Sequence, residues 1–364
     1  MHPKLLSTFS EYSNIILVGW GTGWHIQPIL NIVEELREKK LLWIGGRDSS
    51  EEKEAKKAGI TFESVPTLKL STTKSPKVLL YPFVLLRGIF GARKIIRSVM
   101  STESSVSVKT TRHLAQKEEE IRQDLSLRSA PLEMTEQICV FSKGWPGSVA
   151  IGIAAWSLGI PLYIHESDTI PGRSNRILGK MAETIFLGFE SAKKYFNWKK
   201  CEIIWQILHP VFEWKVRSEE WRVWWKTEKK HILVICGSQG SRAVFEAIVE
   251  QFGKDNPYEW IIALGKLNVD MKSDFQTMGN MQALDWISQE DIAHLLENTD
   301  LAITRGSATT LAEIDVFGVK KIIIPLPYSA DNHQYYNARE YEKRWDILLE
   351  QRDIKNLSNS INSL

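Results

Sequence analysis

The amino-acid sequence predicts an α/β protein of two domains, each built around a parallel β-sheet. Short apolar, β-branched runs alternate with amphipathic stretches of helical period along most of the chain. The succession of strand, glycine-rich turn and helix occurs near residue 15 and restarts near residue 231. The length of 364 residues is also more than one compact core usually takes. These three observations together favour two Rossmann-like domains.

The first domain is expected at residues 1–206. Its first strand covers 15–19, IILVG, and a glycine-rich turn leads from it into a helical pattern over 26–40. Four more strand-like segments start near residues 41, 137, 161 and 184. Residues 100–136 depart from this pattern, because they are polar, charged and short of aromatic side chains. We interpret them as a surface insertion that is flexible or partly helical.

The second domain is expected at residues 207–364. Its first strand starts at 231 and leads through the turn GSQG into a helical pattern over 242–252. Three more apolar runs follow, WIIALG from 260, DLAITRG from 300 and KKIIIPLP from 320. They are typical of buried parallel strands joined by helical crossovers. The two domains are expected to meet near 206–230, where the pattern blurs.

Composition excludes several classes of protein. The formal net charge is only +2, so no overall positive potential favours a nucleic acid as partner. The three cysteines are widely spaced, which fits neither a disulfide framework nor a metal site and favours a reducing cytoplasm. The N-terminus lacks the apolar core of a signal peptide, and no apolar run reaches the roughly 18 residues of a membrane span. We therefore expect any membrane contact to be peripheral, at the cytoplasmic face.

The segment 19–25, GWGTGWH, follows the first strand and is the first candidate site. Open α/β sheets bind ligands at the carboxyl ends of their strands, and glycines there let backbone N–H groups approach a phosphate. We therefore select Gly21, Thr22 and Gly23. His25 follows directly, and its imidazole can accept the proton of a sugar hydroxyl, although a packed or capping histidine is commoner. A dinucleotide fingerprint is disfavoured, because its third glycine is missing.

Three segments of the second domain also combine a strand end with polar residues. The turn 237–240 supplies Ser238 and backbone amides that suit a diphosphate, although a turn without a ligand is about as common. The segment 305–313 places Glu313 where it can accept hydrogen bonds from ribose hydroxyls, although such carboxylates are more often solvated. The segment 331–337, DNHQYYN, is a polar cluster after a proline-rich turn, and polar loops without a ligand are common.

In the first domain, residues 165–168 and then Asn175 follow an apolar strand and are expected to line the cleft opposite these segments. None of the candidate groups has the ligand spacing of a zinc or calcium site. We therefore expect neither a metal nor another cofactor.

Taken together and in order, these segments resemble the MurG family over about residues 14–350. The glycine loop of that family, GGTGGH, resembles residues 20–25. Its AAWxLGIPxxxHEQN stretch resembles AAWSLGIPLYIHESD at 154–168. Its GGSQGAR, RxGAxTxxE and DxxQxxNA motifs resemble residues 236–242, 305–313 and 331–338. Each motif alone is weak, whereas their combination is specific.

The resemblance implies a GT-B fold, in which two Rossmann-like domains face each other across a cleft. It implies an inverting transfer of N-acetylglucosamine (GlcNAc) from UDP-GlcNAc to undecaprenyl-diphospho-MurNAc-pentapeptide, lipid I to lipid II in peptidoglycan synthesis. His25 becomes the candidate general base. Ser238 and Gln239 become diphosphate contacts, and Glu313 the ribose contact. The remaining implied substrate contacts are Thr22, Gly23, Asp168, Asn175, Ile287, His333 and Gln334.

Some positions depart from the family pattern. Asp168 stands where the family usually has asparagine, and Cys236 where it has glycine. The stretch after Ile354 is short, which puts in doubt the last helix that normally braces the two domains. Two alternatives stay open. One is a related transferase for another lipid acceptor, such as a diacylglycerol, and the other is an inactive nucleotide-sugar- or lipid-binding homologue.

Five tryptophans, Trp20, Trp24, Trp145, Trp205 and Trp345, stand where the family pattern has glycine. The codon UGA differs by one base from the tryptophan codon UGG and by one from the glycine codon GGA. Our hypothesis is that UGA encodes glycine in the source organism and has been translated as tryptophan. An indole at position 20 or 24 would occupy the space that a phosphate needs, so literal tryptophans favour the inactive alternative.

Residues 74–97 combine apolar side chains with six cations and no acidic residue. A buried helix would explain the apolar residues but not the cations. A segment at an anionic membrane surface explains both, because apolar side chains can enter the headgroup boundary while cations meet anionic lipid. The cations are Lys74, Lys77, Arg87, Arg93, Lys94 and Arg97.

Overall fold

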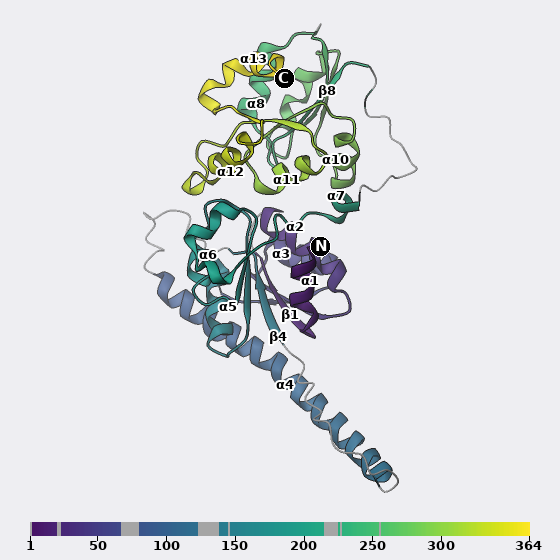
Figure 1. Ribbon diagram of the computed structural model, residues 1–364, viewed down its shortest axis with the longest axis vertical. Helices are drawn as coiled ribbons and strands as arrows, with labels where there is room; N and C mark the ends of the chain where they lie inside the picture. Colours follow the sequence, from purple (N-terminus) through teal and green to yellow (C-terminus); the bar gives the residue numbers. More distant parts are fainter. Residues whose placement is uncertain are drawn as a thin grey trace.

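The computed structural model of the chain contains two α/β domains, drawn one above the other in Figure 1. It describes residues 2–19, 23–66, 80–122, 138–144, 146–214, 225, 228–254 and 256–364. For residues 23–25, 102–122, 146 and 213–214 the description covers the backbone alone.

The first domain contains a parallel sheet of seven strands in the order β3-β2-β1-β4-β5-β6-β7. The strands are β1 (Asn14–Val18), β2 (Lys40–Gly45), β3 (Thr61–Ser64), β4 (Ile138–Ser142), β5 (Leu162–Glu166), β6 (Thr184–Leu187) and β7 (Cys201–Ile203). The strand order reverses between β1 and β4. Open α/β sheets typically bind ligands at such a reversal, so a site is expected at the loops that follow these two strands.

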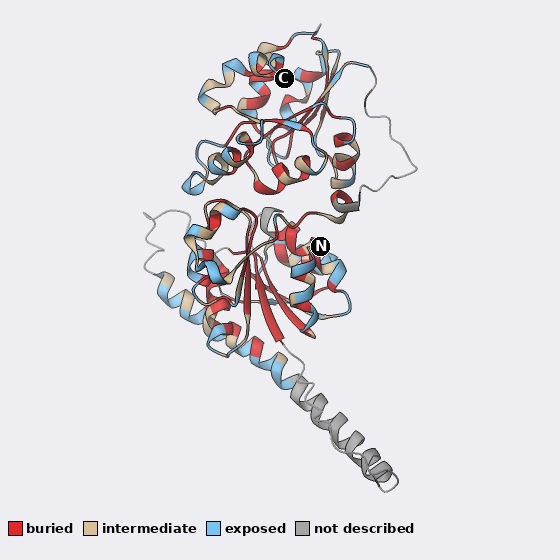
Figure 2. Ribbon diagram, viewed as in Figure 1, coloured by how far each residue is buried: buried red, intermediate tan, exposed pale blue. Residues whose placement is uncertain are grey.

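Helices cover both faces of this sheet, because successive side chains of a strand point to opposite faces. Ile15 and Leu17 pack in one core, and Ile16 and Val18 in the other. The first core is closed by α1 (Pro3–Ser10), α2 (Gly23–Val33) and α3 (Ser50–Lys57). The second is closed by α4 (Tyr81–Arg122), α5 (Pro146–Trp156) and α6 (Arg173–Leu178). Figure 2 shows the strands between them as a buried layer.

The second domain contains a parallel sheet of six strands in the order β10-β9-β8-β11-β12-β13. The strands are β8 (Lys230–Ile235), β9 (Tyr258–Ala263), β10 (Met281–Leu284), β11 (Leu301–Thr304), β12 (Lys320–Ile323) and β13 (Ile347–Leu348). One core includes α8 (Arg242–Gln251), α9 (Lys272–Gln276) and α13 (Leu357–Asn362). The other includes α7 (Pro210–Trp214), α10 (Gln289–Leu296) and α11 (Ala308–Val316).

Helix α12 (His333–Glu342) lies on the side of the second domain that faces the first. A small apolar cluster joins the two domains there, because Phe189 of the first domain packs with Leu311 of α11 and Ala338 and Tyr341 of α12. The rings of Phe189 and Tyr341 meet edge to face, with 6.2 Å between their centroids. Short 3-10 turns elsewhere cover residues 34–36, 190–195, 198–200, 269–271, 330–332 and 351–356.

The strands expected from the apolar runs are all present, as β1, β2, β4, β5, β6, β8, β9, β11 and β12. Four strands were not predicted: β3, β7, β10 and β13. They are the four edge strands of the two sheets. An edge strand is short and partly exposed, so its sequence contains no long apolar run from which it could be predicted.

Helix α4 continues from Tyr81 through Arg122 and thus includes much of the segment 100–136 that we interpreted as an insertion. Residues 123–136 lie outside the described residues. Within the described ranges, no helix is both long enough and apolar enough to cross a membrane.

The sheets leave the segment 204–229 between them, since β7 ends at Ile203 and β8 begins at Lys230. Leu208, Val211 and Phe212 pack in the core of the second domain. This packing supports a boundary at residue 206, which stays our proposal.

Two of the five tryptophans at glycine-like positions are fully described, and both have a left-handed backbone. Trp205 has φ 62° and Trp345 has φ 77°. Their side chains are 53% and 88% exposed, so little packing compensates for this conformation. Trp20 and Trp145 lie outside the described residues, and Trp24 lies in the first turn of α2 with its side chain undescribed. The left-handed region is one that glycine adopts readily and bulky side chains rarely do, as the recoding hypothesis expects.

We expect Trp345→Gly to raise the free energy of unfolding by about 1 kcal/mol, because glycine relieves the strained φ after α12. Trp345→Ala keeps the Cβ atom and should give no such gain. A control is Trp156→Gly, at the helical end of α5 with a side chain that is also exposed, which should lower stability by about 0.5–1 kcal/mol. Urea denaturation of the three variants measures these differences.

A gain with alanine as large as that with glycine would contradict the backbone explanation. Codons UGG at most of the five positions would contradict the recoding hypothesis, while the conformational strain at Trp205 and Trp345 would remain.

Candidate functional site

The N-terminus of α2 follows β1, one of the two strands at which the strand order of the first sheet reverses. Gly23 is the first residue of that helix, and His25 lies in its first turn, although the side chain of His25 is not described. Gly21 and Thr22 lie outside the described residues. The first turn of a helix has backbone N–H groups without helical partners, so this end of α2 is suited to an anion.

A buried lysine that was not predicted as a site residue follows β4, the other strand at this reversal. Lys143 is 2% exposed, and its Nζ donates to Nδ1 of His165 and to Oγ of Ser167, the latter at 2.5 Å. Nε2 of His165 donates to the carbonyl oxygen of Trp205 at 3.0 Å. Burial lowers the pKa of both Lys143 and His165. His165 is therefore a neutral imidazole that links β4 and β5 to the segment joining the domains.

Glu166 holds the loop that follows β5. Its carboxylate accepts hydrogen bonds from the backbone N–H groups of Asp168 at 2.9 Å and Gly172 at 3.1 Å, and from Nδ2 of Asn175 at 2.9 Å. Burial, reinforced by Asp168, raises the pKa of Glu166. A buried carboxyl group with these three donors fixes the loop and the side chain of Asn175 in place.

Asn175 has one buried acceptor that is unused within the described part of the chain. Its side chain is 4% exposed, and Oδ1 has no hydrogen-bond partner among the residues that the structure describes. Gly144 lies against it, because a Cβ added to Gly144 would come within 2.7 Å of that oxygen. Gly144 also has φ 88°, so glycine is required there for both space and backbone. Buried acceptors are rarely left unpaired, so this atom is suited to a donor on a ligand.

In the second domain, the turn after β8 is compact. Gly237 and Gly240 have φ 81° and 74°, and a Cβ added to Gly240 would lie 1.7 Å from the carbonyl oxygen of Leu264. Ser238 is partly exposed and Gln239 exposed, directly before Ser241, the N-cap of α8. The turn thus presents these two residues and the first amides of α8 together.

Glu313 lies on α11 with 7% of its surface exposed. Its only described hydrogen-bond partner is Nε2 of Gln289, at 3.5 Å, which is a weak contact. Burial raises the pKa of Glu313 to about 7. The side chain of Ile287 is buried in a core of the second domain, so only its backbone is available to a ligand.

The last predicted pair, His333 and Gln334, begins α12. Nδ1 of His333 donates to the carbonyl oxygen of Ala330 at 2.7 Å, and Oε1 of Gln334 accepts from the backbone N–H of Leu326 at 3.0 Å. A Cβ added to Gly306 would lie 2.1 Å from the carbonyl oxygen of Gln334. Glycine at 306 therefore lets the start of α12 pack closely on the loop between β11 and α11.

Asp168 is the predicted residue that the structure brings to the second domain. Its Oδ1 accepts a hydrogen bond from Nδ2 of Asn337, on α12, at 2.8 Å. This hydrogen bond places the loop after β5 of the first domain against α12, the helix that begins with His333 and Gln334. Lys143 was missed, because a single lysine after a strand is more often solvated.

Comparisons with known proteins agree with this arrangement. Residues 15–110 and 109–187 match the model of the glycosyltransferase family 28 N-terminal domain, and residues 231–364 match its C-terminal domain. A relative from Sulfurihydrogenibium sp. (strain YO3AOP1) is 28% identical over 89% of this chain and 81% of its own length. It is named UDP-N-acetylglucosamine--N-acetylmuramyl-(pentapeptide) pyrophosphoryl-undecaprenol N-acetylglucosamine transferase. A relative of the same name from Thermosipho melanesiensis is 34% identical over 56% of each chain.

Solved structures share the fold. The crystal structure of Acinetobacter baumannii MurG has a TM-score of 0.68 with 19% identity, covering 96% of this chain and 90% of its own. A UDP-GlcNAc 2-epimerase from Neisseria meningitidis, bound to UDP-GlcNAc, has a TM-score of 0.58 with 11% identity, covering 96% of this chain and 91% of its own. The fold is therefore the expected GT-B arrangement of two Rossmann-like domains, and the chain belongs to glycosyltransferase family 28.

Proposed function

We propose that the chain is an inverting glycosyltransferase that moves GlcNAc from UDP-GlcNAc to undecaprenyl-diphospho-MurNAc-pentapeptide. The observation that carries the proposal is the match, over 89% of the chain, to a relative named for this reaction. Strand, turn and helix sites on both sides of the domain junction support it, because one can hold the donor and the other the acceptor. A related reaction on a different lipid acceptor is the alternative.

The donor binds to the second domain in this proposal. The diphosphate lies at the turn with Ser238 and Gln239, where the N-terminus of α8 favours negative charge. Glu313 accepts hydrogen bonds from the ribose hydroxyls, since its buried carboxyl group has only one weak partner. The uracil contacts the backbone of Ile287, and the transferred sugar contacts His333 and Gln334.

The acceptor binds to the first domain. Gly23 begins α2, and Gly21 and Thr22 precede it in the sequence; the N-terminus of this helix is suited to the diphosphate of the lipid carrier. The unused oxygen of Asn175 accepts a hydrogen bond from a donor group of the sugar, and Asp168 lies in the same loop.

The reaction needs one proton acceptor and one stabilised leaving group. His25 takes the proton of the attacking hydroxyl as its oxygen bonds to the anomeric carbon, and the bond to UDP breaks on the opposite face. The negative charge that develops on UDP meets the first amides of α8. No step requires a metal ion.

Ionisation of Glu313 predicts a pH dependence of donor affinity. The ribose hydroxyls need an ionised carboxylate, and the pKa of Glu313 in the free protein is about 7. The affinity for UDP-GlcNAc should therefore rise roughly tenfold between about pH 6 and pH 8. Glu313→Gln should bind more weakly and show no such rise. Calorimetry with UDP-GlcNAc measures the affinity of the parent and of the variant at each pH; the diphosphate of this ligand is a diester and does not titrate in this range. Equal pH profiles for the two proteins would show that Glu313 is not the ribose contact.

His25→Ala should lower kcat by about 10² to 10⁴ while the KM for UDP-GlcNAc changes little, as loss of a general base implies. The assay follows transfer from labelled UDP-GlcNAc to a short-chain lipid acceptor, with a diacylglycerol in parallel. It is made with the chain as sequenced and with glycine at the five tryptophan positions. An equal loss of donor binding would make His25 a donor-site residue, and transfer to diacylglycerol alone would establish the alternative.

The proposal also places the first domain peripherally on the cytoplasmic face of an anionic membrane. One side of α4 packs in the domain through Gly88, Ala92 and Ile96. Its other side carries exposed apolar side chains, with Phe83 72%, Leu86 53% and Phe90 69% exposed, and Leu80 directly before the helix is 55% exposed. Burial in the domain therefore does not account for these side chains. Lys74, Lys77 and Leu79 lie outside the described residues.

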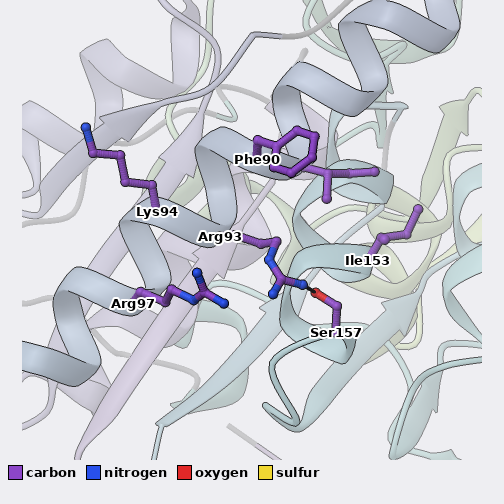
Figure 3. A pocket seen from close by; sticks show the side chains of 7 residues that line it. Phe90, Arg93, Lys94, Arg97, Ile153 and Ser157 are labelled. Carbon is purple, nitrogen blue, oxygen red and sulfur yellow. Dashed lines mark hydrogen bonds between the residues drawn. The ribbon is translucent and has the colours of Figure 1, made fainter.

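Cations border this apolar surface. A hollow of about 500 Å³ lies between α4 and α5 and is lined by Ile89, Phe90, Arg93, Lys94, Arg97, Ile153 and Ser157. Figure 3 shows Arg93 crossing to α5, where it donates to Oγ of Ser157, while Lys94 and Arg97 extend from α4. An anionic headgroup layer attracts phenylalanines that lie beside cations such as Lys94 and Arg97.

Changing Arg93, Lys94 and Arg97 to glutamate should release the protein from anionic liposomes, because each cation near the surface contributes about 1 kcal/mol. The matched control changes Lys53, Lys56 and Lys57 on α3, which covers the opposite face of the sheet, and should bind as the parent does. Sedimentation with anionic and neutral vesicles, at low and high salt, measures this. Equal sedimentation with both kinds of vesicle, or equal loss in both variants, would contradict the placement.

A further inference from the structure

We infer that Asn337 is a positioning residue for the transfer reaction, because its buried amide fixes the first domain's loop 166–172 against the donor-binding domain. This inference rests on the proposed function for its catalytic consequence. Its structural part, the closure of one domain on the other, does not depend on which acceptor is used.

Asn337 uses every hydrogen-bonding position of its side chain. Oδ1 accepts from the backbone N–H and from Oγ1 of Thr169, both at 2.9 Å. Nδ2 donates to Oδ1 of Asp168 at 2.8 Å and to the carbonyl oxygen of Gly306 at 3.1 Å. An amide has two lone pairs on oxygen and two hydrogens on nitrogen, so this set is complete.

The hydrogen bonds of Asn337 are shielded from water, so they favour one relative position of the two domains. Asn337 is 0% exposed and Thr169 is 3% exposed. A buried amide that loses a partner keeps its desolvation cost, so the domains gain these bonds only when both sides are in register. Flanking contacts are weaker. Arg176 and Asp331 approach to 4.0 Å at the surface, and Phe189 packs on Tyr341.

The side-chain amide of Asn337 connects the donor side of the proposed site to its acceptor side. Gln334, a proposed sugar contact, precedes Asn337 by one turn of α12. On the other side, Asp168 and Thr169 belong to the loop that Glu166 holds together with Asn175. A shift of Asn337 relative to this loop therefore changes the distance between the donor sugar and the acceptor. Misplacement of about 1 Å between reactants can slow a reaction by about 10²-fold.

The chain offers a sharp test, because position 168 is an aspartate. Asn337→Asp keeps the shape and the two bonds from Thr169, but it replaces the donor toward Asp168 by an acceptor, so two carboxylates face each other. Adding Asp168→Asn restores a donor on the opposite side and with it the interdomain bond. The bond to the carbonyl oxygen of Gly306 is not restored, so recovery should be partial.

The domain closure is measured directly with spin labels at Lys57→Cys and Glu250→Cys, on exposed faces of α3 and α8, in a Cys201→Ser background. With UDP-GlcNAc present, the parent should give one narrow distance distribution. Asn337→Asp should broaden and lengthen it, and the Asp168→Asn, Asn337→Asp pair should narrow it again. A narrow distribution in the single variant, or no narrowing in the pair, would overturn the inference.

Kinetics and calorimetry then separate positioning from unfolding. Asn337→Asp should lower kcat by about 10- to 100-fold, while the dissociation constant for UDP-GlcNAc changes less than about threefold, since the donor site lies within the second domain. The paired variant should recover part of kcat. A matched loss of donor affinity would make the residue merely structural. If the parent protein transfers GlcNAc to no acceptor, the proposed function is wrong. The distances between the spin labels still test whether Asn337 holds the two domains together.

Discussion

The buried hydrogen bonds between Asn337 and the loop after β5 are the constraint on which the rest of the site depends. Two parallel sheets each present the carboxyl ends of their strands, and a transfer reaction needs these ends at a fixed separation. Apolar packing alone does not set that separation, because a surface such as that between Phe189 and Tyr341 tolerates sliding. A saturated amide does not tolerate it. The fold supplies two half-sites, and one side chain aligns them.

Burial determines the chemistry within each half-site as well. Lys143, His165 and Glu166 are all removed from water, so each is usable only with the partners that the loops provide. Glu313 has one weak partner among the described residues, and its pKa near 7 reflects the burial of its carboxyl group. Buried groups with unused hydrogen-bonding capacity thus occur in both domains, at Asn175 in the first and at Glu313 in the second.

The central strands and most strand-end residues followed from the sequence, because buried parallel strands are continuous apolar runs. Edge strands such as β13, only Ile347–Leu348, carry too few residues to be recognised. Asn337 lay within a polar cluster that was identified, but its function depends on Thr169, 168 residues away, and no local pattern encodes that contact. The division of α4 into a packed and an exposed side was equally unpredictable, because it depends on which residues meet α5.

The backbone of Trp205 has a consequence for the motion that turnover requires. The residue lies just after β7, its carbonyl oxygen holds His165, and its φ is 62°. Product release in a two-domain transferase requires the domains to separate, and the few residues between them absorb the rotation. Glycine at this position would pass freely between left- and right-handed conformations, whereas tryptophan is confined to a narrow part of that range. The residue at position 205 therefore sets the conformational range of the backbone at the point where it leaves the first sheet.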